Sequence, residues 1–409
     1  MQANYQAWQV ASPVDSYFYF KITNIPPKGM LYLKFNFNMD RRNFVTQSVI
    51  ATAATIAGTS IQSFGGILNV NDMTKTDATI AHYRPLTLAG LGGVAAGNGF
   101  HENPDQDVNA ALDATWNAGI RYFDTSPWYG LGLSERRFGH FLRNKKREEY
   151  TLSTKVGRIL IPDNNFELKD GLWKGKLNFN YKYDYSAAGV RKSVEDSLQR
   201  LGLPYLDIVY IHDLSPDNKD FKGKWLEYFE QAKNGAMPEL TKMREEGLIK
   251  GWGLGVNTIE PAIKAMEVAD PDIFLIATQY SLIKHEDALN KLFPICEKKG
   301  VSIVVGAPLN AGFLAGADRY DYSGTFPEGS KEKLSRLKEV AAKHNVDLRS
   351  AALQFCAAPK VISGVIPGAW KADQAANNAA SFKAVIPKAF WDELKKEKLI
   401  AANAAVPSV

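Results

Sequence analysis

The stretch GIRYFDTSPWYG, residues 119–130, contains the arrangement that decides the fold of this chain. Gly119 ends a helical stretch, because glycine readily takes the left-handed conformation found just past a helix. The apolar run Tyr122–Thr125 follows as a short buried strand, and polar and aromatic side chains come where that strand ends. Glycine directly precedes three further strand-like runs, at Gly202, Gly247 and Gly300. A unit of helix, glycine and strand therefore recurs along the chain.

Eight apolar runs of strand type alternate with amphipathic helical stretches beyond residue 80. They span residues 86–91, 122–125, 150–156, 207–212, 251–256, 274–280, 301–307 and 361–366. Successive runs start about 39 residues apart on average, which suits a βαβ unit. No G-x-G-x-x-G motif follows the first run, which disfavours a dinucleotide-binding open sheet. We therefore predict an α/β protein whose residues 80–400 form a single-domain (β/α)8 TIM barrel.

The composition is that of an ordinary globular protein, with 45% apolar and 23% charged residues among 409. The net charge of +5 comes mostly from the first 66 residues, and no basic stripe follows them, so nucleic acid is not an expected partner. The two cysteines, Cys296 and Cys356, are too few for a disulfide framework and lack the spacing of a zinc site. We expect both to be small buried hydrophobic residues, and we expect no metal.

Residues 39–66 have the architecture of a signal peptide: a charged start, a moderately apolar stretch and then small residues. Polar residues interrupt the apolar stretch, so no stable membrane insertion is expected after processing. Residues 41–45, RRNFV, resemble the twin-arginine export signal, which implies a periplasmic or otherwise exported protein. An amphipathic N-terminal helix in a cytoplasmic protein is the alternative. Because such a signal begins near the N-terminus, we predict that translation starts at Met39 and that residues 1–38 are a non-native extension.

Three successive strands of the predicted barrel end in ionisable side chains, namely Asp124, Lys155 and His212, and Tyr129 lies in the loop after Asp124. In a (β/α)8 barrel the reactive groups sit where strands end. A lysine cation beside a phenol stabilises the phenolate and lowers the phenol pKa, so Tyr129 could exchange a proton with a carbonyl oxygen. Asp124 would keep Lys155 charged, and His212 would orient the carbonyl. Taken singly, each residue also has a purely structural explanation.

Two long intervals interrupt the alternation of strands and helices. Residues 158–185 are polar but rich in aromatic side chains, which indicates a loop over the C-terminal face of the strands. These rings could stack on a sugar or a nicotinamide, or could form a small core of the loop itself. Trp128, beside Tyr129, is the candidate substrate-binding residue, although it could equally line a hydrophobic pocket. The interval 312–359 contains two helical stretches.

The motifs FDTSPWYG, LSTKVGR and VYIHD make the chain resemble the aldo-keto reductase family, from about residue 83 to about residue 385. They match the family's catalytic Asp, Tyr, Lys and His, which implies those roles for Asp124, Tyr129, Lys155 and His212. The resemblance also implies a (β/α)8 barrel that binds a nicotinamide dinucleotide without a Rossmann fold and transfers hydride directly. Within the family, YGLGLSERRFG, GLGVN and GAPLNAGFLAG are similar to the signatures of the aldose dehydrogenases.

The same resemblance implies a set of cofactor-binding residues. Asn257 and Gln279 correspond to groups that hydrogen-bond the carboxamide of the nicotinamide. The other positions follow the seventh and eighth strands, and they are Pro308, Leu309, Gly312, Gly368, Lys371, Gln374 and Asn378. Gln374 stands where many members have an arginine for the 2′-phosphate of NADP. A neutral amide cannot supply that charge, whereas Lys371 could, so we expect NAD(P) as the cofactor.

These observations predict an NAD(P)-dependent oxidoreductase that transfers hydride between nicotinamide and a small molecule, namely a sugar or a polyhydroxylated aldehyde or hemiacetal. An alternative on the same fold is a nucleotide-binding, redox-sensing subunit without turnover. A less favoured alternative is an unrelated barrel aldolase or hydrolase with Lys155 as a Schiff-base nucleophile. If the protein is exported, we expect it to carry its cofactor with it, because the space outside the inner membrane lacks a free nicotinamide pool.

Overall fold

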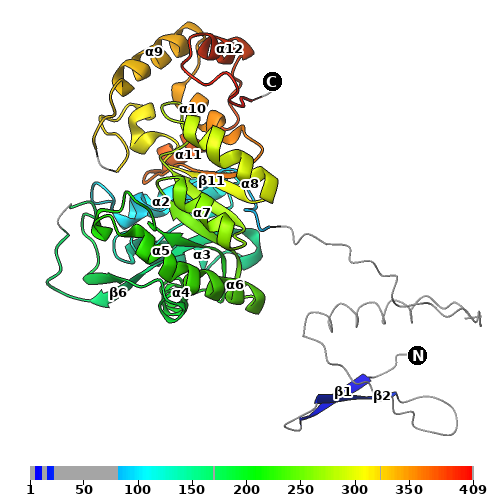
Figure 1. Ribbon diagram of the computed structural model, residues 1–409. Helices are drawn as coiled ribbons and strands as arrows, with labels where there is room; N and C mark the ends of the chain where they lie inside the picture. The colour runs from blue at the N-terminus through cyan, green and yellow to red at the C-terminus, as the bar shows by residue number, and fades with distance from the viewer. Residues whose placement is uncertain (1–4, 12–15, 23–81, 169–170, 323, 408–409) are drawn as a thin grey trace, which may run out of the picture. The chain divides into compact units, whose positions relative to one another are not determined.

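The structure is a computed structural model that describes residues 5–11, 16–22, 82–168, 171–322 and 324–407 (Figure 1). It divides the chain into two units, Met1–Ala78 and Thr79–Val409. In the first unit, strand β1 (Tyr5–Ala11) pairs antiparallel with β2 (Ser16–Ile22), a hairpin that the sequence did not lead us to expect. The predicted signal, residues 39–66, and the predicted start at Met39 lie outside the described residues and stay predictions.

Eight parallel strands form the barrel of the second unit. In their order around the barrel they are β3 (Gly90–Gly92), β4 (Tyr122–Asp124), β5 (Thr151–Val156), β8 (Leu206–His212), β9 (Ile249–Val256), β10 (Ile273–Ala277), β11 (Ser302–Gly306) and β12 (Ile362–Ile366). Parallel bridges from Ala89 to Val365 and from Gly92 to Gly368 join the last strand to the first. These bridges close the sheet, and the predicted (β/α)8 barrel is confirmed.

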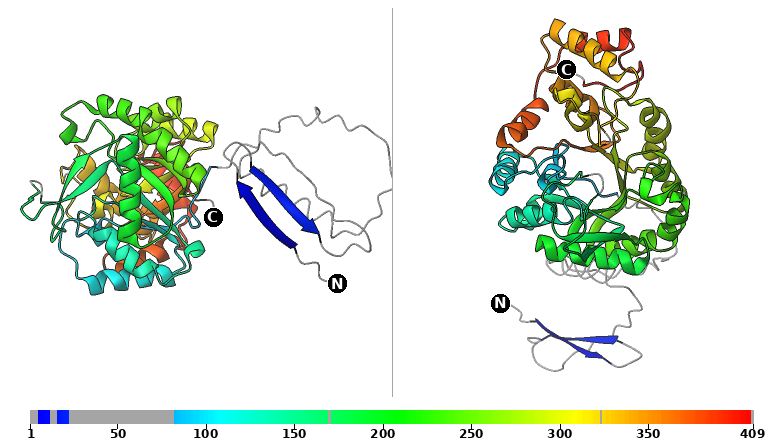
Figure 2. Two further views of the ribbon diagram at one scale, coloured as in Figure 1. Left: turned by 90° about the horizontal axis from the view of Figure 1, so that it is seen from below. Right: turned by 90° about the vertical axis from the view of Figure 1, so that its left-hand side faces the viewer.

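Helices cover the outside of this barrel, and Figure 2 shows them around the strands. They are α2 (Asp105–Asn117), α3 (Leu133–Leu142), α4 (Ala187–Leu201), α5 (Trp225–Asn234), α6 (Ala236–Glu246), α7 (Glu260–Val268), α8 (Phe293–Lys299), α9 (Ser330–Lys343), α10 (Leu348–Ala357), α11 (Ala372–Ser381) and α12 (Lys388–Lys396). Two of them, α9 and α10, are the helical stretches predicted between residues 312 and 359. Among the described residues, no helix is both long enough and apolar enough to cross a membrane.

Helix ends follow the predicted glycines. Gly202 has a φ of +67°, and its backbone N–H donates to the carbonyl of Leu198 at 2.8 Å, which satisfies one of the last free carbonyls of α4. The other three predicted glycines, Gly119, Gly247 and Gly300, also have positive φ. The sequence therefore locates the junctions between helices and strands correctly.

The two cysteines are buried in the helical layer, as predicted. Cys296 lies in α8 and Cys356 in α10, and both are free thiols. Each is part of the apolar core between the helices and the strands. Burial raises the pKa of the Cys296 thiol to about 12, so this side chain stays a neutral hydrophobic residue at neutral pH.

Two predicted strand boundaries and one predicted loop differ from the structure. Leu86 and Leu88 are exposed, and the first strand comprises only residues 90–92. The sixth strand ends at Ala277, because Thr278 has a left-handed φ of +62° that interrupts the extended chain. The interval 158–185 is more than a loop, since β6 (Arg158–Pro162) and β7 (Phe179–Tyr183) pair as an antiparallel hairpin.

The interior of the barrel has a small core of its own that closes one end. Tyr122, whose hydroxyl lies 3.2 Å from that of Tyr210, is part of this core. Tyr83 packs against it, and its hydroxyl donates to Asp207 near the start of β8 at 3.2 Å. Because the amino-terminal end is filled in this way, the carboxyl ends of the strands are the place for a site.

Candidate functional site

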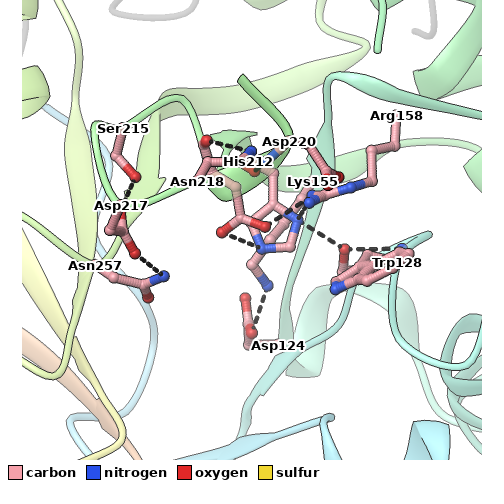
Figure 3. A network of polar contacts seen from close by, with 12 residues as sticks. Asp124, Trp128, Lys155, Arg158, His212, Ser215, Asp217, Asn218, Asp220 and Asn257 are labelled. Carbon is pink, nitrogen blue, oxygen red and sulfur yellow. Dashed lines mark hydrogen bonds and ion pairs between the residues drawn. The ribbon is translucent and has the colours of Figure 1, made fainter. Parts of the chain in front are cut away.

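The predicted pair of Asp124 and Lys155 lies inside the barrel (Figure 3). Asp124 is the last residue of β4, and Lys155 lies near the end of β5; each side chain is only 1% exposed. Lys155 Nζ donates to Asp124 Oδ2 at 2.8 Å and to the carbonyl of Thr125 at 2.7 Å. Ser153 Oγ donates to the other carboxylate oxygen at 2.7 Å. Each of these buried polar groups therefore has partners, and the geometry of the pair is fixed.

Tyr129 and His212 complete the predicted group. The Nζ of Lys155 lies 4.5 Å from the centre of the Tyr129 ring, and the rings of Tyr129 and His212 are 5.9 Å apart. His212 is the last residue of β8, two strands from Asp124 in the sheet. The structure thus brings the four predicted residues together at one end of the barrel.

The expected lowering of the Tyr129 pKa is wrong for this structure. Burial, together with the negative charge of Asp124, raises the pKa of Tyr129 well above its usual value of about 10. Burial also lowers the pKa of Lys155 and raises that of Asp124, and the attraction between the two opposes both changes. Desolvation exceeds the effect of the nearby cations, so the free site holds Tyr129 as a neutral phenol.

His212 is also held in its neutral form. Its Nδ1 lies at hydrogen-bond distance from Ser126 Oγ, at 3.2 Å, and Arg158 Nη1 lies 3.5 Å away. Burial, then the cations Arg158 and Lys155, lower the pKa of His212 well below 6.5. A neutral imidazole keeps one N–H to donate to a substrate oxygen.

These residues border a cavity of about 140 Å³. Tyr129, Lys155 and His212 line it on the side of the predicted chemistry. Its further walls include the rings of Trp128, Trp173 and Tyr322 and the polar groups of Asp213 and Asn257. The structure thus places Trp128, the predicted substrate-binding residue, at the cavity.

Trp173 is a wall residue that our site prediction missed. It is 5% exposed, and its ring centre lies 5.8 Å from that of Trp128 and 5.5 Å from that of Tyr129. Its indole N–H is buried and has no hydrogen-bond partner among the described residues. The aromatic content of residues 158–185 was the available signal, but it did not say which ring enters the site.

Two more cavity residues were missed, and for different reasons. Asp213 directly follows His212 in the VYIHD motif, so its place at the strand end could have been inferred. Tyr322 lies in the long connection after β11, where the sequence has no regular period to place a side chain.

The two residues expected to hold the nicotinamide lie beside each other. Gln279 Nε2 donates to the backbone carbonyl of Asn257 at 2.6 Å, and Asn257 Nδ2 donates to Asp217 Oδ2 at 3.1 Å. Asn257 lines the cavity together with Lys155 and Tyr129. An amide group bound here would therefore lie next to the predicted proton donor.

The residues expected to hold the phosphates and the adenosine lie after the two neighbouring strands. Pro308, Leu309 and Gly312 follow β11, where Asn310–Ala315 forms the short helix η6. After β12, Gln374 Oε1 accepts the N–H of Trp370 at 3.1 Å, and Asn378 Nδ2 donates to the carbonyl of Gly368 at 3.2 Å. Lys371 Nζ lies 4.4 Å from the centre of the Trp370 ring.

A dinucleotide fits this set of residues. The predicted contacts follow β9, β10, β11 and β12, four neighbouring strands, and therefore form one row along the rim. A side chain at Gly368 would meet nothing closer than the carbonyl of Gly92 at 3.9 Å, so the backbone there is open to close approach by a phosphate. The row ends at Asn257 inside the cavity.

The Schiff-base alternative finds no support in this geometry. Lys155 donates hydrogen bonds to both Asp124 and Thr125, and its side chain is buried below the phenol ring. A nucleophilic amine needs a free lone pair directed at the substrate carbon. We therefore retain the oxidoreductase interpretation.

Comparisons with known proteins identify the family of this chain. Residues 89–398 match the model of the aldo/keto reductase family. The D-threo-aldose 1-dehydrogenase of a Pseudomonas species is 34% identical over 345 residues, which cover 80% of this chain and 99% of that protein. The pyridoxal 4-dehydrogenase of Microbacterium luteolum is 34% identical over 336 residues, covering 77% of this chain and 95% of that protein.

A comparison with solved structures agrees with the barrel fold. The holo form of an aldo-keto reductase from Bacillus halodurans matches with a TM-score of 0.58 at 24% identity, covering 80% of this chain and 99% of that one. The family match spans most of the chain and includes every strand of the barrel. The chain belongs to the aldo/keto reductase family, and it is an NAD(P)-dependent oxidoreductase.

Proposed function

We propose that this protein is an aldose dehydrogenase, which oxidises the hemiacetal carbon of a sugar to the lactone. The same site could also reduce a polyhydroxylated aldehyde to the alcohol. The observation that carries the proposal is the cavity in which Tyr129, Lys155 and His212 face the rings of Trp128 and Trp173. The relatives named D-threo-aldose 1-dehydrogenase and, at 28% identity, L-galactose dehydrogenase of Arabidopsis thaliana support a sugar substrate.

The proposed chemistry assigns a proton to Tyr129 and a hydrogen bond to His212. The nicotinamide, when bound, exchanges a hydride with the substrate carbon. In reduction, the neutral phenol of Tyr129 donates its proton to the substrate oxygen as that oxygen gains charge. In oxidation, the phenolate accepts the hydroxyl proton, and the Lys155 cation 4.5 Å from the ring centre stabilises that form. His212 donates to the same oxygen and fixes its position.

A polyhydroxylated substrate suits the walls of the cavity. The C–H faces of a sugar pack on indole rings, and Trp128 and Trp173 present two rings almost perpendicular to each other, at 88°. The buried indole N–H of Trp173 is a hydrogen-bond donor that a sugar hydroxyl could satisfy. Asp213 and Asn257 provide further polar partners on the wall.

A substrate panel tests the proposal. Purified protein with NAD+ or NADP+ is offered aldoses, polyols, pyridoxal and short aliphatic alcohols, and reduced nicotinamide is followed by its absorbance. We expect kcat/KM for at least one aldose to exceed that for the aliphatic alcohols by about a hundredfold, since the latter leave the polar wall unpaired. Preference for pyridoxal or an aliphatic alcohol would refute the sugar assignment, and cofactor oxidation limited to one turnover would favour the redox-sensing alternative.

For the cofactor, we propose that NAD is used at least as well as NADP. The side-chain oxygen of Gln374 is engaged with the backbone of Trp370, and the amide carries no charge for a 2′-phosphate. Asp373, in the first turn of α11, adds a negative charge beside it. The ratio of kcat/KM for the two cofactors tests this assignment, and a strong preference for NADP would refute it.

For the location, we propose export through the twin-arginine route with the cofactor already bound. The support is the RRNFV stretch at residues 41–45, since that route carries folded proteins. Protein taken from its native cell would then begin after residue 39, lie outside the inner membrane and release a dinucleotide on denaturation. A cytoplasmic protein that retains residues 1–38 would refute the export proposal.

A further inference from the structure

Arg158 is a buried cation beside the site, and the proposed chemistry does not use it. It is the first residue of β6 and follows closely on Lys155 in β5. Between the two strands, Gly157 has a φ of +112°, and a side chain there would collide with the ring of Tyr185. This turn places the guanidinium of Arg158 next to the imidazole of His212 (Figure 3).

The guanidinium is held from several directions. Nη1 lies 2.8 Å from Asp213 Oδ2, and Nη2 donates to the hydroxyl of Tyr183 at 2.7 Å. The rings of Trp128 and Tyr183 lie 4.5 Å and 4.7 Å from its central carbon. Among the described residues, Arg158 is the one cation within ion-pair distance of Asp213, whose other close neighbour is the neutral ring of His212.

The hydrogen bonds around His212 determine which ring nitrogen carries the hydrogen. Ser126 Oγ accepts the backbone N–H of Trp128 at 3.1 Å, so its own hydrogen is available for His212 Nδ1 at 3.2 Å. Arg158 Nη1, 3.5 Å from the same nitrogen, can only donate. Arg158 therefore requires Nδ1 to be an acceptor, and Ser126 can supply a hydrogen to it, which leaves the ring hydrogen on Nε2.

The opposite side of the ring faces the cavity. Nε2 lies 3.4 Å from Asp213 Oδ1, and both His212 and Asp213 line the cavity, whereas Ser126 and Arg158 do not. A hydrogen on Nε2 is thus on the side where a substrate oxygen would bind.

The cations around His212 oppose a positive charge on its ring, whereas the carboxylate of Asp213 favours a hydrogen on Nε2. Arg158 from β6 and Lys155 from β5 oppose a positive charge on the ring, and the neutral phenol of Tyr129 adds no charge. The hydroxyl of Tyr185 donates to the His212 carbonyl at 2.8 Å. Asp213 is the one acidic group in contact with the ring, and its other oxygen is paired with Arg158.

We infer that Arg158, held by Asp213, is a positioning residue that fixes His212 as the neutral imidazole with its hydrogen on Nε2. The inference rests on the proposed function in one respect: that function provides the substrate oxygen to which this N–H donates. Protonation would give Nδ1 a hydrogen directed at the Arg158 guanidinium, which cannot accept it. Arg158 therefore keeps His212 a donor of fixed direction.

Nuclear magnetic resonance of the full chain with 15N-labelled histidine and NAD+ tests the inference without turnover. Loss of one set of signals in His212→Gln assigns that ring. We expect wild-type His212 to show the Nε2–H tautomer and to remain unprotonated down to about pH 6. An Nδ1–H imidazole, or a ring that protonates near its ordinary pKa of about 6.5, would overturn the inference without any Arg158 variant.

Two variants separate positioning from mere packing. Arg158→Met keeps bulk but removes the charge and the donor, so the pH of His212 protonation should rise by about one pH unit or more. Arg158→Lys keeps a cation without the planar fork, so it should retain the low protonation pH but show a mixture of tautomers. Unchanged tautomer and titration in Arg158→Met would overturn the inference.

The kinetic consequence is a change in how kcat/KM depends on pH on the acidic side of the profile. The kcat/KM of Arg158→Met should fall about tenfold more than that of the wild type between about pH 8 and pH 6. If no sugar is oxidised by the wild type, the proposed function fails, while the resonance result still decides the role of Arg158.

Discussion

At the scale of single residues, the proton chemistry depends on Tyr129, a buried residue whose ring centre lies 4.5 Å from the Nζ of Lys155. Replacing Tyr129 by Phe removes the transferable proton and leaves the ring in place. We expect kcat to fall by about a hundredfold to ten-thousandfold, because general acid–base transfer has that magnitude. Cofactor affinity, measured by fluorescence titration, should change little.

Tyr322→Phe is the matched control, because it removes a hydroxyl from the same cavity without touching Lys155. Similar losses in both variants would contradict a specific proton transfer by Tyr129.

The raised pKa of Tyr129 predicts different pH dependences for the two directions of the reaction. The neutral phenol is the reactive form in reduction, and it persists throughout the neutral range because burial raises its pKa. The phenolate is the reactive form in oxidation, so kcat/KM for oxidation should rise with pH across the range from about 7 to about 10. Initial rates in both directions, measured in constant-ionic-strength buffers, check this. An oxidation rate independent of pH would contradict it.

The cofactor preference depends on one neutral side chain at position 374. Gln374→Arg adds a planar cation at the start of α11, and charge-assisted pairs with phosphate are stronger than neutral ones. We expect the ratio of kcat/KM for NADP over NAD to rise about tenfold. Gln374→Met is the control, because it also removes the bond to the Trp370 N–H but adds no charge. An equal change in both variants would show that only the loop conformation had changed.

The sequence is informative for residues at strand ends and much less so for their environment. Asp124, Lys155 and His212 were placed correctly because the end of a parallel strand has a defined position in a barrel. The direction of the shift in the Tyr129 pKa was not predicted correctly, because the burial of Tyr129 depends on rings such as Trp173, which come from a distant part of the chain. Charge patterns in a sequence say nothing about desolvation.

At the scale of elements, the hairpin β6–β7 could not be predicted from the sequence. Residues 158–162 follow β5 after a single glycine, and their partner strand begins only at Phe179. Pairing across such a distance leaves no local period to recognise. Helix ends, in contrast, are local events, so a glycine such as Gly202 with its left-handed conformation could be predicted.

The segment 158–185, which contains this hairpin, also includes Trp173, whose indole lies at the cavity. Trp173→Phe keeps an aromatic ring but removes the buried N–H. If that group binds a substrate hydroxyl, KM for the sugar should rise about fivefold while kcat changes less, since a hydrogen bond to a neutral group contributes about 1 kcal/mol. A series of deoxy sugars identifies the hydroxyl, because the correct deoxy sugar should be insensitive to the substitution. Equal effects on every sugar would contradict the hydrogen bond.

Loop contacts across the rim predict slow release of the cofactor. The guanidinium of Arg319, after β11, lies 3.7 Å from the ring centre of Phe100, after β3, and donates to the carbonyl of Ala311. His101 contacts the ring of Trp370, after β12, at 4.8 Å. A dinucleotide bound at Gly312 and Gly368 would have to pass these contacts when it leaves.

Arg319→Ala should therefore increase the rate of NADH release about three- to thirtyfold, the range expected for loss of a cation–π contact. Stopped-flow displacement of NADH by excess NAD+ measures that rate directly. Lys331→Ala removes a similar contact, with Phe326 at 4.2 Å, and serves as the control. Equal release rates in the wild type, Arg319→Ala and Lys331→Ala would contradict the proposal that these loop contacts slow release of the cofactor.

At the scale of the whole molecule, the C-terminal segment is attached to the barrel through a histidine that must stay neutral. His285 is fully buried after β10; its Nδ1 donates to the carbonyl of Ser281 at 3.0 Å, and its Nε2 accepts the N–H of Ala401 at 3.0 Å. The residues before this contact, Leu399 and Ile400, are buried in the main core. A second proton on the ring would place two N–H groups against each other and detach the segment.

This contact predicts a loss of stability in mild acid. Burial lowers the pKa of His285 below its ordinary value of 6.5, although the charge of Glu286 opposes that change. The unfolded chain then binds a proton more readily than the folded one, so the contribution is complete above about pH 6.5 and decreases below it. The free energy of unfolding should fall by up to about 1.4 kcal/mol per pH unit from this group alone.

Thermal or urea unfolding at several pH values between about 5 and about 8 measures the effect as a difference between proteins. His285→Gln cannot titrate, so its stability should depend less steeply on pH than that of the wild type, whatever its absolute stability. The control is His140→Gln, because His140 is exposed at the end of α3 and should follow the wild-type slope. Parallel curves for the wild type and His285→Gln would mean that the C-terminal attachment does not depend on a neutral His285.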